Sequence, residues 1–312
     1  MTPDLLSRSW TLLRRDPFLL WLGLGMSLSS LFGTGWRLWG AQLITLNFAG
    51  LTNLQTIESL LFSDEILQMQ QLLWRGLLLA FGQFVLVWLI ALLAEAGIVA
   101  AVTAVSHQNP TSLHHAIQQG RRWLSRFLAI DLLVFFPWFL IALLLLLILL
   151  VLALLLASFA ASEPSLGKVF TTTGVGLFCI LGLALLLMPV GLVSFWVRLL
   201  TFREAVVHEV AGRTAVRQTW QRIRQHFGDV FVLVVMLWGG QTLLLGAFGL
   251  LTSPLLTWLT PLTNSSTIAL QATSWLALLL VTLLVWLVRG GIAAFVAIAW
   301  TLAYLNLSEE EN

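Results

Sequence analysis

Five long apolar stretches constrain the fold of this chain more than any other feature. They are Leu77–Val105, Leu128–Ala157, Val169–Leu200, Val230–Leu259 and Ile268–Leu305. Each is longer than the roughly 20 residues that a helix needs to cross a hydrocarbon core about 30 Å thick. A shorter stretch, Phe18–Phe32, follows Arg14 and Arg15, and we interpret it as a retained helix rather than a signal peptide. The sequence therefore predicts six transmembrane helices.

The composition agrees with a membrane solvent. Apolar residues make up 59% of the 312 residues and charged residues only 10%, whereas soluble domains carry about 25% charged residues. This excludes a soluble enzyme, a nucleic-acid binder and a disordered scaffold. We expect an all-α integral membrane protein with a single polytopic domain over residues 1–312, whose first partner is the lipid bilayer.

The basic residues predict the orientation. Twelve of them lie in or next to the N-terminal segment, the second-to-third connection and the fourth-to-fifth connection, all on one side of the membrane. Three lie on the other side of the membrane: Arg37, Arg75 and Lys168. Because basic residues stay on the cytoplasmic side, both termini are predicted to be cytoplasmic. The polar residues among apolar ones in Gly33–Arg75 predict an extracytoplasmic excursion with short interfacial helices, and residues 306–312 are predicted to form a cytoplasmic tail.

Three segments that precede outward spans superpose without gaps. They are Leu5–Arg15, Ala116–Arg126 and Ala215–Gln225, with a small residue at the same position in each: Ser9, Gly120 and Thr219. The return spans share a glycine two residues after Glu95, Pro189 and Arg289. We predict three repeats of an amphipathic helix plus a transmembrane hairpin, over approximately residues 3–105, 113–200 and 212–305. The alternative is chance similarity among leucine-rich segments.

The amphipathic segments are rich in arginine and carry tryptophan, a pattern typical of helices at a membrane interface. Their predicted contacts with lipid headgroups, anionic ones in particular, are made by Arg14, Arg15, Arg121, Arg122, Arg126, Arg222 and Arg224. The alternative is that these helices only cap the bundle.

Catalytic, metal-binding and cofactor motifs are not found in the sequence, so we predict no catalytic residues, no metal site and no cofactor. The five histidines fit solvated polar faces. The pairs Gly23/Gly25, Gly240/Gly246 and Gly290/Gly291 are predicted to permit close helix approach. Pro137 and Pro189 interrupt spans, as kinks in packed helices or as the broken helices of a transporter.

Two charges lie deep in the predicted spans. An unpaired charge at mid-bilayer costs about 2.5–3.5 kcal/mol on insertion scales. We therefore predict an intramembrane ion pair between Glu95 and Arg289, the alternative being that each finds its own polar partner. Asp131 and Arg198 lie near helix ends and are predicted to reach the headgroup level by snorkelling.

Several short motifs carry a resemblance to a known group. They are Arg203-Glu-Ala-Val-Val-His-Glu-Val, Ala215-Val-Arg-Gln-Thr-Trp, Phe227-Gly-Asp-Val, Ser7-Arg-Ser-Trp10 and Ala299-Trp-Thr-Leu-Ala-Tyr304. With them the chain resembles bacterial six-span proteins related to the membrane domain of glycerophosphoryl diester phosphodiesterases. The resemblance implies a multi-pass protein of the bacterial inner membrane. It carries over no catalytic residue, because the phosphodiesterase activity of that group belongs to a separate barrel domain.

The sequence leaves two classes of function. The first is a non-enzymatic scaffold, assembly factor or accessory subunit of a membrane complex, with membrane proteins as partners. The second is a transporter or lipid-handling protein, which the predicted repeats favour and the scarcity of polar residues in the spans opposes.

Overall fold

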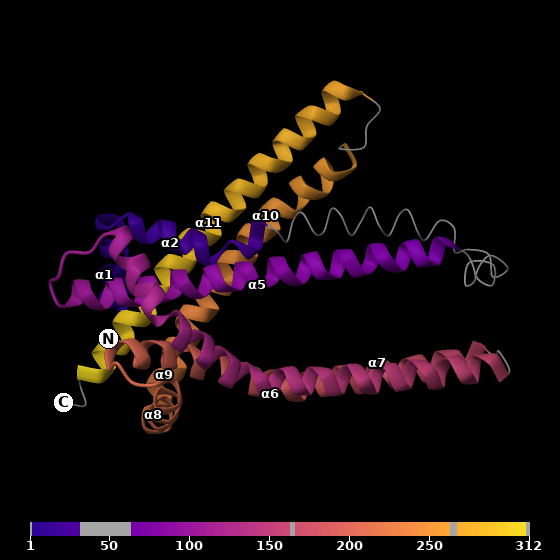
Figure 1. Cartoon of the computed structure of the whole chain (residues 1–312), viewed down its shortest axis with the longest axis horizontal. Coiled ribbons are helices and arrows are strands. Elements are labelled where there is room, and N and C mark those ends of the chain that lie inside the picture. The colour runs from indigo at the N-terminus through magenta and orange to yellow at the C-terminus, as the bar shows by residue number, and fades with distance from the viewer. Residues whose placement is uncertain (1, 32–63, 163–165, 263–266, 310–312) are drawn as a thin grey trace. The chain divides into compact units, whose positions relative to one another are not determined.

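The computed structural model describes residues 2–31, 64–162, 166–262 and 267–309 (Figure 1). Its elements are helices α1 (Thr2–Arg15), α2 (Phe18–Met26), α5 (Asp64–Ser106), α6 (Leu113–Ser162), α7 (Leu166–Val207), α8 (Gly212–Gln225), α9 (Phe227–Val234), the π-helical segment η1 (Val235–Gly239), α10 (Gly240–Leu262) and α11 (Ile268–Glu309). The predicted all-α class is therefore confirmed for the described residues.

Four helical segments in the described part of the chain are long and apolar enough to cross a membrane. They are Trp74–Ser106, Leu113–Leu145, Phe227–Leu259 and Ile268–Ser308. Their surfaces expose large apolar side chains such as Leu79, Leu143 and Leu250, as expected for helices in lipid. The predicted span Val169–Leu200 is helical within α7, and the predicted span Phe18–Phe32 ends outside the described residues.

Two helices extend beyond the apolar stretches, into segments predicted to lie outside the membrane. Residues 64–75, placed in the extracytoplasmic excursion, are the first turns of α5, whose 43 residues extend over about 65 Å. Glu65, Leu67 and Met69 are strong helix formers, so the helix begins well before the apolar stretch. The rest of the predicted excursion lies outside the described residues. At the other end, α11 runs to Glu309, so helix replaces most of the predicted tail.

The three amphipathic segments differ in how they end. α1 ends at Arg15 because Pro17 disfavours a helical conformation at Asp16, and α8 is also a separate helix. The middle segment, Ala116–Arg126, instead continues into the membrane-spanning part of α6, since no helix breaker follows it. In all three, the small residue of the alignment is buried: Ser9, Gly120 and Thr219.

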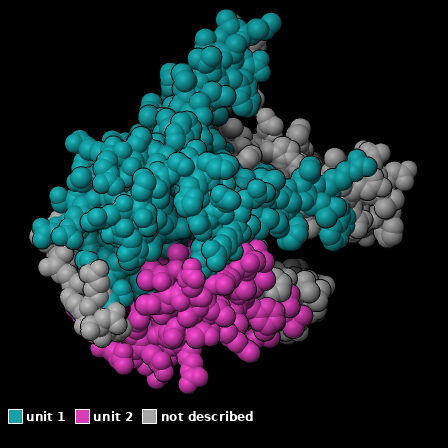
Figure 2. Space-filling view, turned by 60° about the vertical axis from the view of Figure 1, so that its left-hand side comes forward, with its two compact units in different colours: residues 1–124, 232–312 teal, residues 125–231 magenta. Residues whose placement is uncertain are grey.

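Contacts divide the chain into two compact units: unit 1 is residues 1–124 and 232–312, and unit 2 is residues 125–231 (Figure 2). In unit 1, α2 and the C-terminal part of α5 pack on α11 around Leu19, Ile98 and Ile298. In unit 2, the N-terminal part of α7 follows α6 and its C-terminal part packs on α8. Phe127 and Phe202 are both fully buried there and stack with ring centroids 3.9 Å apart.

Glycines allow backbones to approach in unit 1. A Cβ on Gly23 would lie 2.3 Å from the carbonyl oxygen of Gly290, and a Cβ on Gly120 would lie 2.7 Å from that of Leu93. The predicted close approach is thus confirmed at Gly23 and Gly290. It is wrong at three of the other predicted glycines, where a Cβ would meet nothing within 4 Å: Gly240, Gly246 and Gly291.

The prolines do not interrupt their helices. Pro137 lies inside α6 and Pro189 inside α7, and both helices continue past them. The irregular segment is η1, a π-helical turn between α9 and α10. Continuous helices agree with prolines inside packed helices and not with the broken-helix alternative, whereas an irregularity that the sequence did not predict occurs in the span Val230–Leu259.

Candidate functional site

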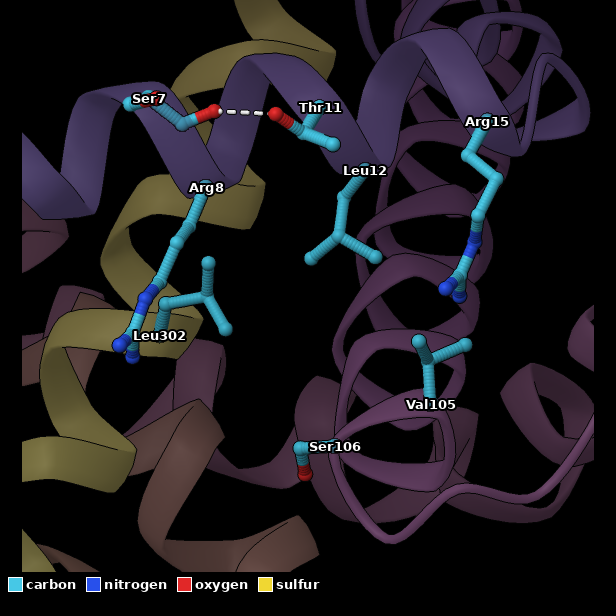
Figure 3. Close-up of a pocket in the computed structure, with 8 residues that line it drawn as sticks. All are labelled: Ser7, Arg8, Thr11, Leu12, Arg15, Val105, Ser106 and Leu302. Atoms are coloured by element: carbon cyan, nitrogen blue, oxygen red, sulfur yellow. Dashed lines mark hydrogen bonds between the residues drawn. The ribbon is translucent and has the colours of Figure 1, made fainter.

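A cavity of about 310 Å³ lies beside α1 in unit 1 (Figure 3). We call it the α1 cavity. Its lining residues come from α1, from the last turn of α5 and from α11: Ser7, Arg8, Thr11, Leu12, Arg15, Val105, Ser106 and Leu302. The lining therefore contains two arginines, three hydroxyl-bearing residues and three aliphatic side chains.

Helix α1 positions the two arginines. Arg8 and Arg15 are seven residues apart, about two helical turns, so they project from the same side of the helix. Figure 3 shows both side chains extending in the same direction, on either side of Leu12. Thr11 lies between them and donates its hydroxyl to the carbonyl oxygen of Ser7 at 2.8 Å. The cavity thus combines cationic donors with hydroxyl groups.

The charges of the cavity are only weakly compensated. The Arg15 guanidinium lies 3.2 Å from a carboxylate oxygen of Asp16, but Arg15 is 63% exposed, and such surface pairs contribute little. Within the described residues, Arg8 has no ion pair. The lining itself contains no acidic residue. The site therefore favours an anion.

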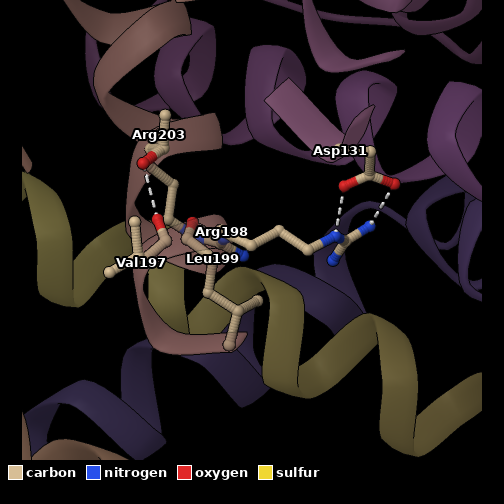
Figure 4. Close-up of polar contacts among 6 residues, drawn as sticks. Asp131, Val197, Arg198, Leu199 and Arg203 are labelled. Carbon is tan, nitrogen blue, oxygen red and sulfur yellow. Dashed lines mark hydrogen bonds and ion pairs between the residues drawn. The ribbon is translucent and has the colours of Figure 1, made fainter. Parts of the chain in front are cut away.

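A second polar cluster, in unit 2, joins helices rather than lining a cavity. Arg198 on α7 binds Asp131 on α6 through both carboxylate oxygens, at 2.5 and 3.4 Å (Figure 4). Asp131 is 1% exposed and Arg198 is 15% exposed. The guanidinium also lies 4.5 Å from the ring centroid of Phe202. These residues do not snorkel as predicted, because they pair with each other inside unit 2.

The end of α7 carries the rest of this cluster. Glu204, which is 1% exposed, lies 2.9 Å from the guanidinium of Arg222 on α8. Arg222 also contacts His208 at 3.3 Å. The fully buried Arg203 donates to the carbonyl oxygen of Leu199. We call Asp131, Arg198, Arg203, Glu204 and Arg222 the buried charge cluster.

The predicted headgroup arginines separate into two groups. Five are exposed: Arg14, Arg15, Arg121, Arg122 and Arg224. The other two make contacts within unit 2: Arg222 binds Glu204, and Arg126 donates to the carbonyl oxygen of Glu209 at 3.2 Å. Arg126 and Arg222 therefore also join helices, and the headgroup role of all seven arginines stays a prediction.

The structure places Glu95 and Arg289 in surroundings that differ in burial, and their pairing stays a prediction. Glu95 on α5 is 4% exposed, whereas Arg289 on α11 is exposed. Helix α2 contacts their neighbours Ala94 and Gly290, so it packs against both helices at this level. Glu95 also lies about three turns before the end of α5, and Arg289 more than five turns before the end of α11.

The burial of Arg203 and Glu204, which follow the predicted span Val169–Leu200, was not predicted from the sequence. The signal was present, because Phe202, Ala205 and Val206 continue the apolar pattern of the span past Leu200. The chain matches no family model, no curated protein and no solved structure. Its resemblance to the six-span group therefore stays a prediction.

Proposed function

We propose that the chain is a non-enzymatic scaffold or accessory subunit of a membrane complex. The buried charge cluster is the observation that carries this proposal. A transporter places intramembrane charges around a water-filled path, whereas Asp131 and Arg198 pair with each other between α6 and α7. Glu204 and Arg222 similarly join α7 to α8. A rigid helix assembly with apolar outer surfaces is suited to holding other membrane helices.

The proposed topology has six spans, with both termini on the cytoplasmic side of a bacterial inner membrane. The twelve-to-three distribution of basic residues supports it. Exposed Trp10 and Trp220 support an interfacial position for α1 and α8, because tryptophan favours that depth. Arg14 and Arg224 lie over these rings at 5.0 and 5.2 Å, where their charges can meet anionic lipid.

The three repeats are also part of the proposal, but their equivalent positions are now defined by the helix ends and no longer by the shared glycines. The last three residues of α5 and of α7 are Ala-Val-Ser and Ala-Val-Val, and a histidine follows each helix. The residue after that histidine has a positive φ in both cases, Gln108 at 62° and Glu209 at 52°. An amphipathic segment follows each turn. This common helix end is a better guide to equivalent positions than the glycines Gly97 and Gly191, because it includes a rare backbone conformation.

Isolation of the chain in lipid nanodiscs from its native membrane tests the function. We expect a complex of fixed stoichiometry with a second membrane protein, measured by native mass spectrometry. Reconstituted alone into proteoliposomes, the chain should give no solute or lipid flux above that of empty vesicles. A solitary chain that supports flux would contradict the scaffold and favour a transporter.

Lipid handling is the second candidate function. The observation that favours it is the α1 cavity, with two arginines and three hydroxyl groups beside aliphatic side chains. Lipid scrambling by the reconstituted chain, measured with a fluorescent phospholipid, distinguishes it from a scaffold that merely holds lipid.

A further inference from the structure

We propose that the α1 cavity is a binding site for the phosphate group of an anionic phospholipid. The inference rests on the membrane placement proposed above and is independent of the scaffold role. Guanidinium groups bind phosphate through parallel N–H donors, and their charge is permanent. Arg8 and Arg15 supply two such groups on one side of α1, and Ser106 lines the same cavity.

Most of the last carbonyl groups of α5, the helix that ends at the cavity, accept hydrogen bonds and so are not free to oppose an anion. α5 ends at Ser106, where unpaired carbonyl oxygens would repel phosphate. The following turn closes them: the backbone N–H of Gln108 donates to Val105 at 3.0 Å and that of Asn109 donates to Ala104 at 3.0 Å. The positive φ of Gln108 makes this turn possible.

The shape of the cavity favours a lipid headgroup over a free phosphate ion. About 310 Å³ lies at the lower end of the range of small-molecule sites. Leu12, Val105 and Leu302 line it beside the polar groups. A free ion would leave these aliphatic side chains in contact with water, whereas the glycerol and first methylene groups of a phospholipid would cover them.

Titration of the full-length, delipidated chain in detergent tests the site. Short-chain phosphatidylglycerol is the ligand, and phosphatidylcholine is the neutral comparison. We expect Arg8→Gln with Arg15→Gln to weaken phosphatidylglycerol binding at least tenfold. The matched control, Arg213→Gln with Arg217→Gln, removes two exposed arginines outside the lining and should change binding less than threefold. Equal losses in the two double variants would overturn the proposal, because they would indicate only diffuse attraction.

Two further arms make the assignment specific. Ser106→Leu fills the cavity without removing charge, so it should also weaken binding; unchanged binding would overturn the site. Inorganic phosphate at millimolar concentration should not displace the lipid, and displacement would overturn the lipid assignment in favour of the free ion. Thermal unfolding without lipid should be unchanged in the arginine variants, because both side chains are exposed.

Discussion

The two units join their helices by different means. In unit 1 the backbones of α2 and α11 approach at Gly23 and Gly290, and the surrounding core is aliphatic. In unit 2 the helices are joined by Asp131 with Arg198 and by Glu204 with Arg222. Glycine contact depends on the absence of atoms, whereas a charge pair depends on the presence of both partners.

The difference has a physical consequence for tolerance to substitution. A glycine contact fails when any side chain is added, but it leaves no unpaired polar group. A buried ion pair fails when one partner is removed, because desolvation of the remaining charge is then uncompensated. Unit 2 should therefore be more sensitive to single polar substitutions, and unit 1 to small increases in volume.

The largest effect is expected at the Asp131–Arg198 pair. Asp131→Ala leaves a mostly buried guanidinium, and breaking such a pair costs about 3–5 kcal/mol. The free energy of unfolding, measured by SDS titration in one detergent, should fall by that amount. Replacement of both residues, Asp131→Leu with Arg198→Met, should recover much of the loss. Additive losses in the double variant would show that the two residues do not act as a pair.

A smaller effect is expected at the crossing of α2 and α11. Gly290→Ala would place a Cβ 2.9 Å from the backbone Cα of Leu24, and such overpacking costs about 1–3 kcal/mol. The adjacent Gly291→Ala is the control, because its Cβ would meet nothing within 4 Å. It should be neutral or stabilising by up to about 1 kcal/mol, since alanine favours helix. Equal stability of the two variants in the same titration would contradict the close approach.

The Glu204–Arg222 contact should contribute less. Arg222 is 25% exposed, so solvent screens the pair, and Arg222→Gln should cost about 1 kcal/mol of unfolding free energy. Arg224→Gln on the same helix removes an exposed charge and should change stability by less than about 0.5 kcal/mol. A loss as large for Arg224 as for Arg222 would argue against a specific link between α7 and α8.

The helices themselves could largely be predicted, because hydropathy and helix-breaking residues act locally. Leu128–Ala157 and Ile268–Leu305 lie within single helices, as expected. The start of α5 at Asp64 was missed since interfacial polarity in residues 64–75 does not prevent a helix from continuing. Hydropathy indicates which residues lie in lipid, but it says little about the residue at which a helix begins.

The site could be predicted only in part. Arg15 was predicted to contact lipid headgroups and Arg8 was not, and Val105, Ser106 and Leu302 belong to helices far away in sequence. Asp131 and Arg198 are likewise on different helices, so their pairing depends on which faces of α6 and α7 meet. Glu95 and Arg289 were paired on equal depth alone, which says nothing of the faces that their helices present, and their pairing stays a prediction.

The smallest effect per residue concerns lipid at the membrane interface, where the two units again differ. Arg121 and Arg122 in unit 1 are exposed, whereas Arg126, a few residues further along α6 in unit 2, donates to the carbonyl oxygen of Glu209. A charge near an anionic surface contributes about 1 kcal/mol. Arg121→Gln with Arg122→Gln should therefore reduce the preference of the chain for spin-labelled phosphatidylglycerol over phosphatidylcholine, measured by electron paramagnetic resonance in bilayers. Arg126→Gln should leave that preference nearly unchanged, because its guanidinium is already engaged by the protein. If Arg126→Gln reduced the preference as much per charge as the other two substitutions, the headgroup role predicted for Arg126 would be supported and its engagement by the protein would not limit it.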